Sequence, residues 1–121
     1  MKEIIEDFES RTFEYGSSDC CQFVGACVES VRGYNPVTQW FDYDGEDGAK
    51  ALIESYGSLA TLVTVKLGPP CDDYQDGDVA MFNQTDGSQI LGVVLGDDVV
   101  LKSITGVVRW PVNRAHAVWR T

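Results

Sequence analysis

Apolar residues recur at helical spacing in the stretch that follows Asp19. The positions in this series are Cys20, Phe23, Val24, Cys27, Val28 and Val31. Because residues three and four apart share one face of a helix, the series predicts a helix with one buried face. Ser18 and Asp19 are suitable N-cap residues before it, and Gly33 is a suitable stop after it.

Shorter patterns predict the remaining elements. Amphipathic spacing indicates helices from Met1 to about Arg11, from about Glu46 to Tyr56, and just after Ser58. After Pro70 the pattern changes to apolar, β-branched runs separated by Gly and Asp, which is typical of strands joined by tight turns. The expected strands cover residues 79–82, 90–95, 99–101, 107–110 and 115–120. This order predicts an α+β fold, with N-terminal helices packed on an antiparallel sheet of about five strands.

Length and charge limit the classes of function. A chain of 121 residues suits a single domain spanning 1–121. The formal net charge of −10 argues against partners made of nucleic acid and against anionic membrane surfaces. No apolar run is long enough to insert in a membrane, and the charged start lacks the pattern of a signal peptide. We therefore expect a protein made in the cytoplasm, with its four cysteines as free thiols.

Cys20 is the first candidate for chemistry, because it stands on the first turn of the predicted central helix. Unpaired N–H groups and the helix dipole favour an anion there, so a thiolate would be stabilised. Nucleophilic cysteines are often placed in this way. The alternative is that Cys20 is a core residue, because it belongs to the apolar series and free cysteine is commonly buried.

A nucleophilic cysteine also needs a base, and His116 is the chain's only histidine. It lies on the last predicted strand, between two alanines, and would serve as a base if a neighbouring strand carried it to Cys20. A lone histidine is more often structural than catalytic. Cys21 is a weaker nucleophile candidate, since it leaves the apolar series and gains no base.

Neither metals nor cofactors are expected. The adjacent pair Cys20–Cys21 is a poor chelating arrangement for zinc, and the chain has no C-x-x-C pair. The acidic stretch 42–48 resembles a calcium loop, but its glycine comes too early and Ile53 stands where the closing glutamate is required. Tyr15, Trp40 and Trp110 are candidate binding residues for a peptide or glycan, and the alternative for such aromatic residues is a place in the core or an interface.

Three motifs in order carry a resemblance to a known superfamily. They are Asp-Cys-Cys-Gln-Phe-Val at 19–24, Gly-Asp at 77–78 and Gly-Val-Val-Leu-Gly at 92–96. The chain resembles the NlpC-type cell-wall peptidases, and most closely a small phage-encoded branch of them. The resemblance covers nearly the whole chain and implies a papain-like fold.

The resemblance assigns the catalytic positions, and most of them depart from the family's pattern. Cys20 matches the nucleophile, Asp19 caps its helix, and Asp78 matches an acid with a structural role. The base position falls on Ile90. The orienting position falls near Lys102, and the tyrosine of the approach loop corresponds to Phe13. An aliphatic side chain cannot accept a proton, so the family's thiol–imidazole pair cannot form here.

The function that we expect follows from this departure. The resemblance implies a phage virion, and a catalytically degenerate domain that is a structural or interaction component of the tail tip or baseplate hub region. Its partners would be other hub or distal tail proteins, with peptidoglycan as a further contact. The alternative is an active cysteine hydrolase, a peptidoglycan endopeptidase or amidase that opens the host wall during DNA entry. It would use Cys20 with a non-standard base such as His116.

Overall fold

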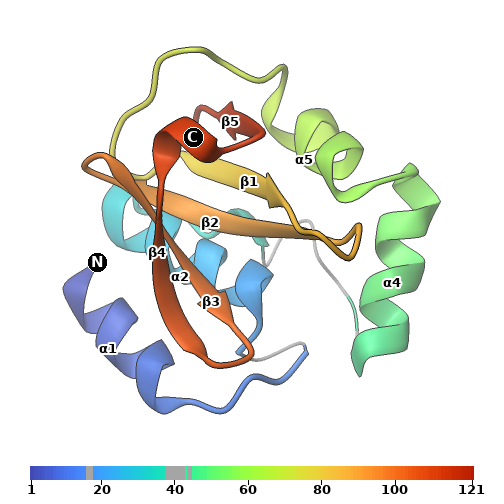
Figure 1. Cartoon of the computed structure of the whole chain (residues 1–121), viewed down its shortest axis with the longest axis horizontal. Helices are drawn as coiled ribbons and strands as arrows, with labels where there is room; N and C mark the ends of the chain where they lie inside the picture. The colour runs from blue at the N-terminus through green and yellow to red at the C-terminus, as the bar shows by residue number, and fades with distance from the viewer. Residues whose placement is uncertain (16–17, 38–42, 44) are drawn as a thin grey trace.

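The computed structural model describes residues 1–15, 18–37, 43 and 45–121. In this part of the chain four α-helices precede five strands, which form one antiparallel sheet (Figure 1). The predicted α+β fold with N-terminal helices and a five-stranded antiparallel sheet is therefore confirmed. The helices are α1 Lys2–Ser10, α2 Cys20–Arg32, α4 Gly45–Tyr56 and α5 Leu59–Leu67.

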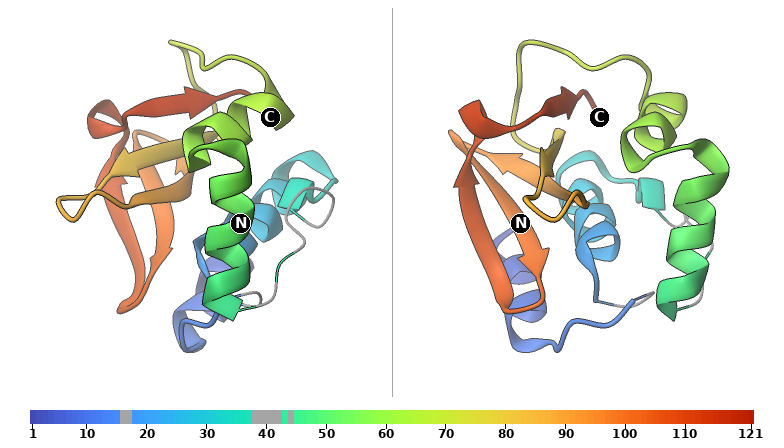
Figure 2. Two further views of the ribbon diagram at one scale, coloured as in Figure 1. Left: turned by 90° about the vertical axis from the view of Figure 1, so that its right-hand side faces the viewer. Right: turned by 45° about the vertical axis from the view of Figure 1, so that its right-hand side comes forward.

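The strands follow one another as hairpins until the last one returns to the first. Their order in the sheet is β4-β3-β2-β1-β5. The helices α2, α4 and α5 lie on the same side of this sheet (Figure 2). Packing contacts join α2 to β2 and β3, α1 to α2 and β4, and α5 to α4 and β5. The strands are β1 Val79–Asn83, β2 Gln89–Leu95, β3 Asp98–Ser103, β4 Gly106–Pro111 and β5 Ala117–Trp119.

The central helix α2 begins and ends where the sequence predicted. The Asp19 carboxylate accepts a hydrogen bond from the Gln22 backbone N–H at 2.8 Å, and Gly33 ends the helix with φ at 85°. The expected buried face is wrong at two positions: Cys21 is buried instead of exposed, and Val31 is 37% exposed. The helix is covered on a second side, where a Cβ on Gly25 would lie 2.4 Å from the Asn35 side chain.

Both faces of the sheet are buried. One face packs against the helices through Met81, Leu91 and Val93, which join Phe23 and Val28 of α2 in the larger core cluster. The other face holds a smaller cluster, whose buried residues are Ala80, Phe82, Ile90, Val94, Val99, Leu101 and Val112. This second core explains why the central strands have continuous apolar runs instead of the alternation typical of a half-exposed sheet.

A buried lysine fastens α1 to the sheet. Lys102 on β3 is 1% exposed. Its Nζ donates to the carbonyl oxygens of Phe8 at 2.7 Å and Arg11 at 2.6 Å. These carbonyls lie at the C-terminal end of α1, where the Phe8 oxygen also accepts from the Arg11 backbone N–H at 3.2 Å. Lys102 therefore holds the end of α1, and with it the start of the loop that leads to α2.

Asp78, directly before β1, is also fully buried, with 0% of its surface exposed. Its carboxylate accepts hydrogen bonds from the backbone N–H groups of Gln75 at 2.9 Å and Thr121 at 3.2 Å. The guanidinium groups of Arg32 and Arg120 lie 3.5 and 3.6 Å away. One carboxylate thus joins β1 to the last turn of α2 and to residues 120–121, which supports the structural role expected for it.

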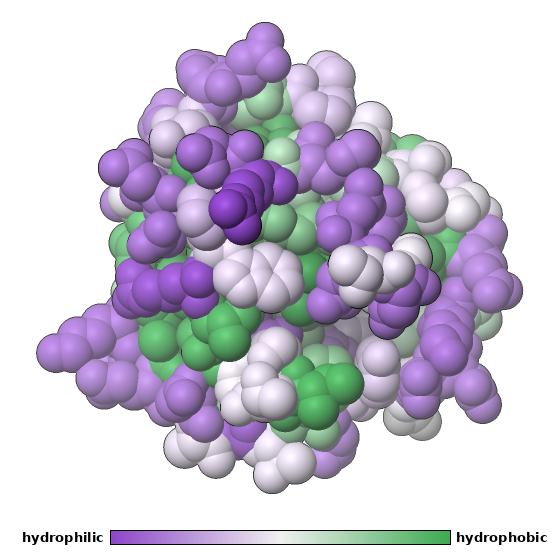
Figure 3. Space-filling view, in the orientation of Figure 1, coloured by the Kyte–Doolittle hydropathy of each residue, from purple (hydrophilic) through white to green (hydrophobic). Residues whose placement is uncertain are grey.

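No helix in the described residues is long and apolar enough to cross a membrane. On the face seen in Figure 3, hydrophilic residues predominate and apolar atoms appear between them in separate groups.

Asp78→Asn should lower the free energy of unfolding by about 2 kcal/mol, because the amide removes the charge that both arginines face and donates where Asp78 accepts. Urea unfolding followed by circular dichroism measures this. Asp73→Asn is the matched control, since Asp73 pairs with Arg120 at the surface and should change stability little. Equal midpoints for the two variants would contradict the role given to Asp78.

Candidate functional site

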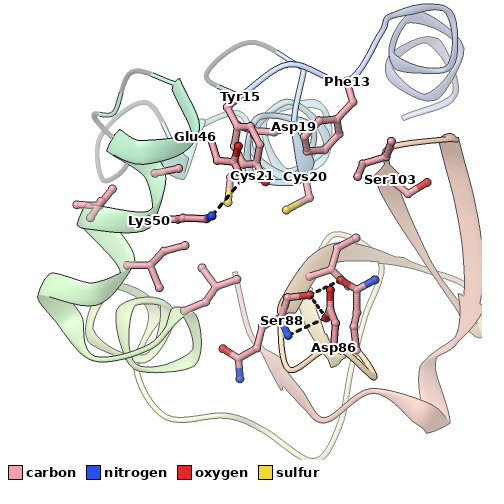
Figure 4. A pocket seen from close by; sticks show the side chains of 18 of the residues that line it. Phe13, Tyr15, Asp19, Cys20, Cys21, Glu46, Lys50, Asp86, Ser88 and Ser103 are labelled. Carbon is pink, nitrogen blue, oxygen red and sulfur yellow. Dashed lines mark hydrogen bonds and ion pairs between the residues drawn. The ribbon is translucent and has the colours of Figure 1, made fainter.

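A cleft of about 810 Å³ opens beside the N-terminus of α2 (Figure 4). It lies between α4, the loop before α2 and the turns that join β1 to β2 and β3 to β4. Its walls are largely apolar, and the residues that form them include Leu52, Ile53, Leu59 and Ile90. Such a shape suits a ligand or a protein segment of mixed polarity.

Charged and polar side chains stand at the rim of this cleft. Lys50 forms an ion pair with Glu46, one helical turn earlier on α4, at 3.1 Å. On the opposite side the Ser88 hydroxyl donates to the Asp86 carboxylate at 2.6 Å. None of these four residues was predicted from the sequence to line a cleft. Spacing indicates the Glu46–Lys50 pair on one helix, but no local signal places it opposite the β1–β2 turn.

Cys20 is half-buried, and its sulfur points into the cleft (Figure 4). It stands where β2 and β3 separate, since these strands pair only from Val93 to Leu95. Its side chain therefore touches both core clusters. Cys20 thus combines the two interpretations offered by the sequence, since it packs on the core and also faces the cleft.

The surroundings of Cys20 favour the thiolate. A hydrogen bond from the Cys21 thiol lowers the pKa of Cys20, a hydrogen bond from the Leu91 backbone adds to this, and burial opposes it. The same hydrogen bond and burial raise the pKa of Cys21. Burial raises the pKa of Cys27, deeper in the helix, to about 12. Among these three thiols, Cys20 is thus the one suited to react.

Asp19 holds the start of the helix in place. Its side chain is 2% exposed, and its two oxygens accept from the Gln22 N–H and from the Tyr43 hydroxyl. Burial, with Asp19 and Cys21 nearby, raises the pKa of Tyr43, so its hydroxyl keeps the proton that it donates. Asp19 is therefore a cap, as expected, and its oxygens are occupied by positioning contacts.

The structure does not bring His116 to Cys20. The prediction that His116 lies on the last strand is wrong, because β5 begins at Ala117. His116 is exposed, its backbone N–H donates to the Met81 carbonyl at 2.7 Å, and it is not among the described residues that line the cleft. Ile90, which the resemblance assigns to the base position, is buried on the cleft wall. The cleft therefore holds a thiol and, among the described residues, no imidazole.

The aromatic candidates lie apart from one another. Tyr15 lines the cleft and packs edge-on against Phe13, with ring centroids 5.1 Å apart. Burial and the nearby Glu46 raise the pKa of Tyr15. Trp110 lies outside the cleft, in a second hollow beyond the β1–β2 turn. Trp40 is outside the described residues, as are Asp42 and Asp44 of the calcium-like stretch.

Within the described residues, no group of three or more His, Cys, Asp or Glu side chains is placed to hold a metal ion. The rest of the calcium-like stretch is Tyr43 and the first turn of α4, which starts at Gly45.

The chain belongs to the family described as "Domain of unknown function (DUF6950)", whose model matches residues 1–121. No curated protein matches the chain significantly. The family description names no activity, so the function has to be argued from the cleft.

Cys20 should be alkylated by iodoacetamide at lower pH than an unperturbed thiol of pKa about 8.5, because a lowered pKa gives more thiolate at every pH below it. Cys21→Ala should move the midpoint upward, since it removes the hydrogen bond that contributes most. Peptide mapping by mass spectrometry gives the rate at each cysteine of the folded chain. Cys71, outside the cleft, is the internal comparison, and Cys27 should stay unlabelled. Equal rates at Cys20 and Cys27 would contradict this account.

Proposed function

We propose that this chain is a papain-like, NlpC-type domain without a catalytic base, which acts as a structural or interaction component of a phage tail. The tip or baseplate hub region is the place that the resemblance implies, and other hub or distal tail proteins are the partners. The order of elements supports this proposal, since a helix with a cysteine on its first turn packs against an antiparallel sheet.

One observation carries the proposal: among the described residues that line the cleft, none is an imidazole that could exchange a proton with the Cys20 thiol. Cysteine peptidases need a group that takes the thiol proton and then protonates the leaving amine. Here Ile90 occupies the base position, and His116 is exposed elsewhere. The carboxylate nearest in sequence, Asp19, is engaged in capping α2. An amide bond attacked by Cys20 would therefore return to reactant, because the amine could not leave.

What remains without catalysis is a cleft of about 810 Å³ lined by apolar and polar side chains. Its apolar walls and polar rim resemble the composition of docking surfaces between proteins, where a buried apolar centre is surrounded by polar residues. The thiol then has the role of a wall residue. This use of the cleft fits an interaction component better than it fits an enzyme.

A second candidate function is the hydrolase, and one observation favours it. Cys20 faces the cleft and its pKa is lowered, as a nucleophile requires. In this case Cys20 would attack peptidoglycan amides, and a non-standard base would take the thiol proton and then protonate the leaving amine. His116 would have to move from its exposed place before β5, which its backbone hydrogen bond to Met81 opposes.

Incubation with purified peptidoglycan separates the two functions. The unmodified chain and Cys20→Ala should both release new amino groups at the rate found in buffer alone, because neither can expel the amine. The measurement is the yield of free amines over time, with a known wall amidase as positive control. Release above buffer by the unmodified chain and its loss in Cys20→Ala would overturn the proposal in favour of the hydrolase.

The proposed location in the phage tail can be tested separately. Mass spectrometry of purified virions from the phage that encodes this chain should detect it at a fixed copy number relative to the hub proteins. Its presence in infected cells together with its absence from purified virions would contradict a role in the tail.

A further inference from the structure

A second hollow, of about 470 Å³, lies on the other side of the β1–β2 turn from the cleft. We call it the Trp110 groove. Trp110 of β4 is half-buried there and packs edge-to-face on Phe82 of β1, with ring centroids 5.0 Å apart. Gln84 lines both the groove and the cleft, so the two hollows meet at this turn.

The polar lining of the groove differs from that of the cleft. Asn83, Gln84 and Thr85 are exposed and border it from the end of β1 and the turn after it, and Arg114 borders it from the short 3-10 helix Val112–Arg114. The described lining contains no Asp or Glu, in a chain that has 19 of them. The described part of the chain shows no ion pair for Arg114. Arg114 is therefore the one charged side chain among the described lining residues of the groove.

We propose that the Trp110 groove binds a glycan that carries a carboxylate. A sugar ring would pack its C–H side on the indole face of Trp110, because that face carries partial negative charge. The amide and hydroxyl groups of Asn83, Gln84 and Thr85 both donate and accept, as neighbouring sugar hydroxyls require. Arg114 supplies the planar, bidentate donor pair that a carboxylate prefers.

The charge of the whole chain makes this local arrangement informative. A net charge of −10 repels anions at long range, and screening at physiological salt leaves the contacts within about 8 Å to decide binding. A groove whose one charged lining side chain is an arginine therefore offers an anion a short-range contact that the net charge does not cancel. A proline-rich peptide would also use Trp110 and Pro111, but it would leave Arg114 without a partner.

This inference rests on the proposed function in one respect: a tail component meets the bacterial wall, which is rich in glycans. The amide-release assay above does not depend on the Trp110 groove. A chain that binds no glycan would still be a catalytically inactive domain, and a chain that binds one would not thereby be shown inactive.

The test is a two-dimensional 1H–15N NMR titration of the full chain with tetragalacturonate, an oligosaccharide with a carboxylate on every ring. The indole N–H signal of Trp110, assigned from Trp110→Phe, should shift with saturation. The Trp119 signal should stay, since Trp119 is buried and its Nε1 donates to Thr64. Arg114→Gln should weaken binding about tenfold, because it removes a hydrogen-bonded charge.

Arg109→Gln is the matched control. Arg109 is exposed on the same strand, one residue before Trp110, and successive side chains of a strand point to opposite faces. It removes the same charge away from the groove and should leave the affinity unchanged. No shift of the Trp110 signal at about 10 mM oligosaccharide would overturn the proposal. Equal losses in Arg114→Gln and Arg109→Gln would overturn it too, as would a decaproline peptide moving the Trp110 signal when the glycan does not.

Discussion

The site depends above all on the burial of α2 between the sheet and the segment that follows the helix. Phe23, Cys27 and Val28 are completely buried, and a large apolar side chain buried in this way contributes about 1.5–3 kcal/mol. This packing holds α2 against β2 and β3. The N-terminus of the helix therefore lies where these two strands separate. Asp19, nearly as buried, then caps the first turn and sets the direction of Cys20.

That position gives Cys20 one of the two features that a cysteine peptidase needs, a nucleophilic thiol with a lowered pKa. Hydrogen bonds from Cys21 and from the backbone of Leu91 lower the pKa of Cys20, which favours the thiolate, while burial opposes it. The second feature is an imidazole base. Ile90 stands at the position that the resemblance assigns to this base, and no described side chain that lines the cleft is an imidazole. A thiolate alone attacks good electrophiles, but it cannot expel an amine that nothing protonates. This is the ground on which we propose a binding role for the cleft rather than a hydrolytic one.

The periodic elements could be predicted from the sequence because local rules decide them. The cap at Asp19, the stop at Gly33 and the apolar runs of the strands all specify their own structure. The exchanged burial of Cys20 and Cys21 could not be predicted, since it depends on how α2 rotates against two core clusters at once. The burial of Lys102 could not be predicted either, because lysine is usually a surface residue. It is buried here because its Nζ binds the carbonyls at the end of α1, a contact between distant parts of the chain. His116 was placed on a strand that starts one residue later.

The most direct test of the account is the pH profile of Cys20 alkylation in the unmodified chain and in His116→Ala, measured over the range in which imidazole and thiol groups ionise. The account predicts one ionisation, with the same midpoint in both proteins, because the thiolate owes its stability to Cys21 and Leu91 and not to an imidazole. Two ionisations in the unmodified chain, with the lower one lost in His116→Ala, would mean that a thiolate–imidazolium pair exists. That result would contradict our central proposal, that the Cys20 thiolate works without an imidazole base.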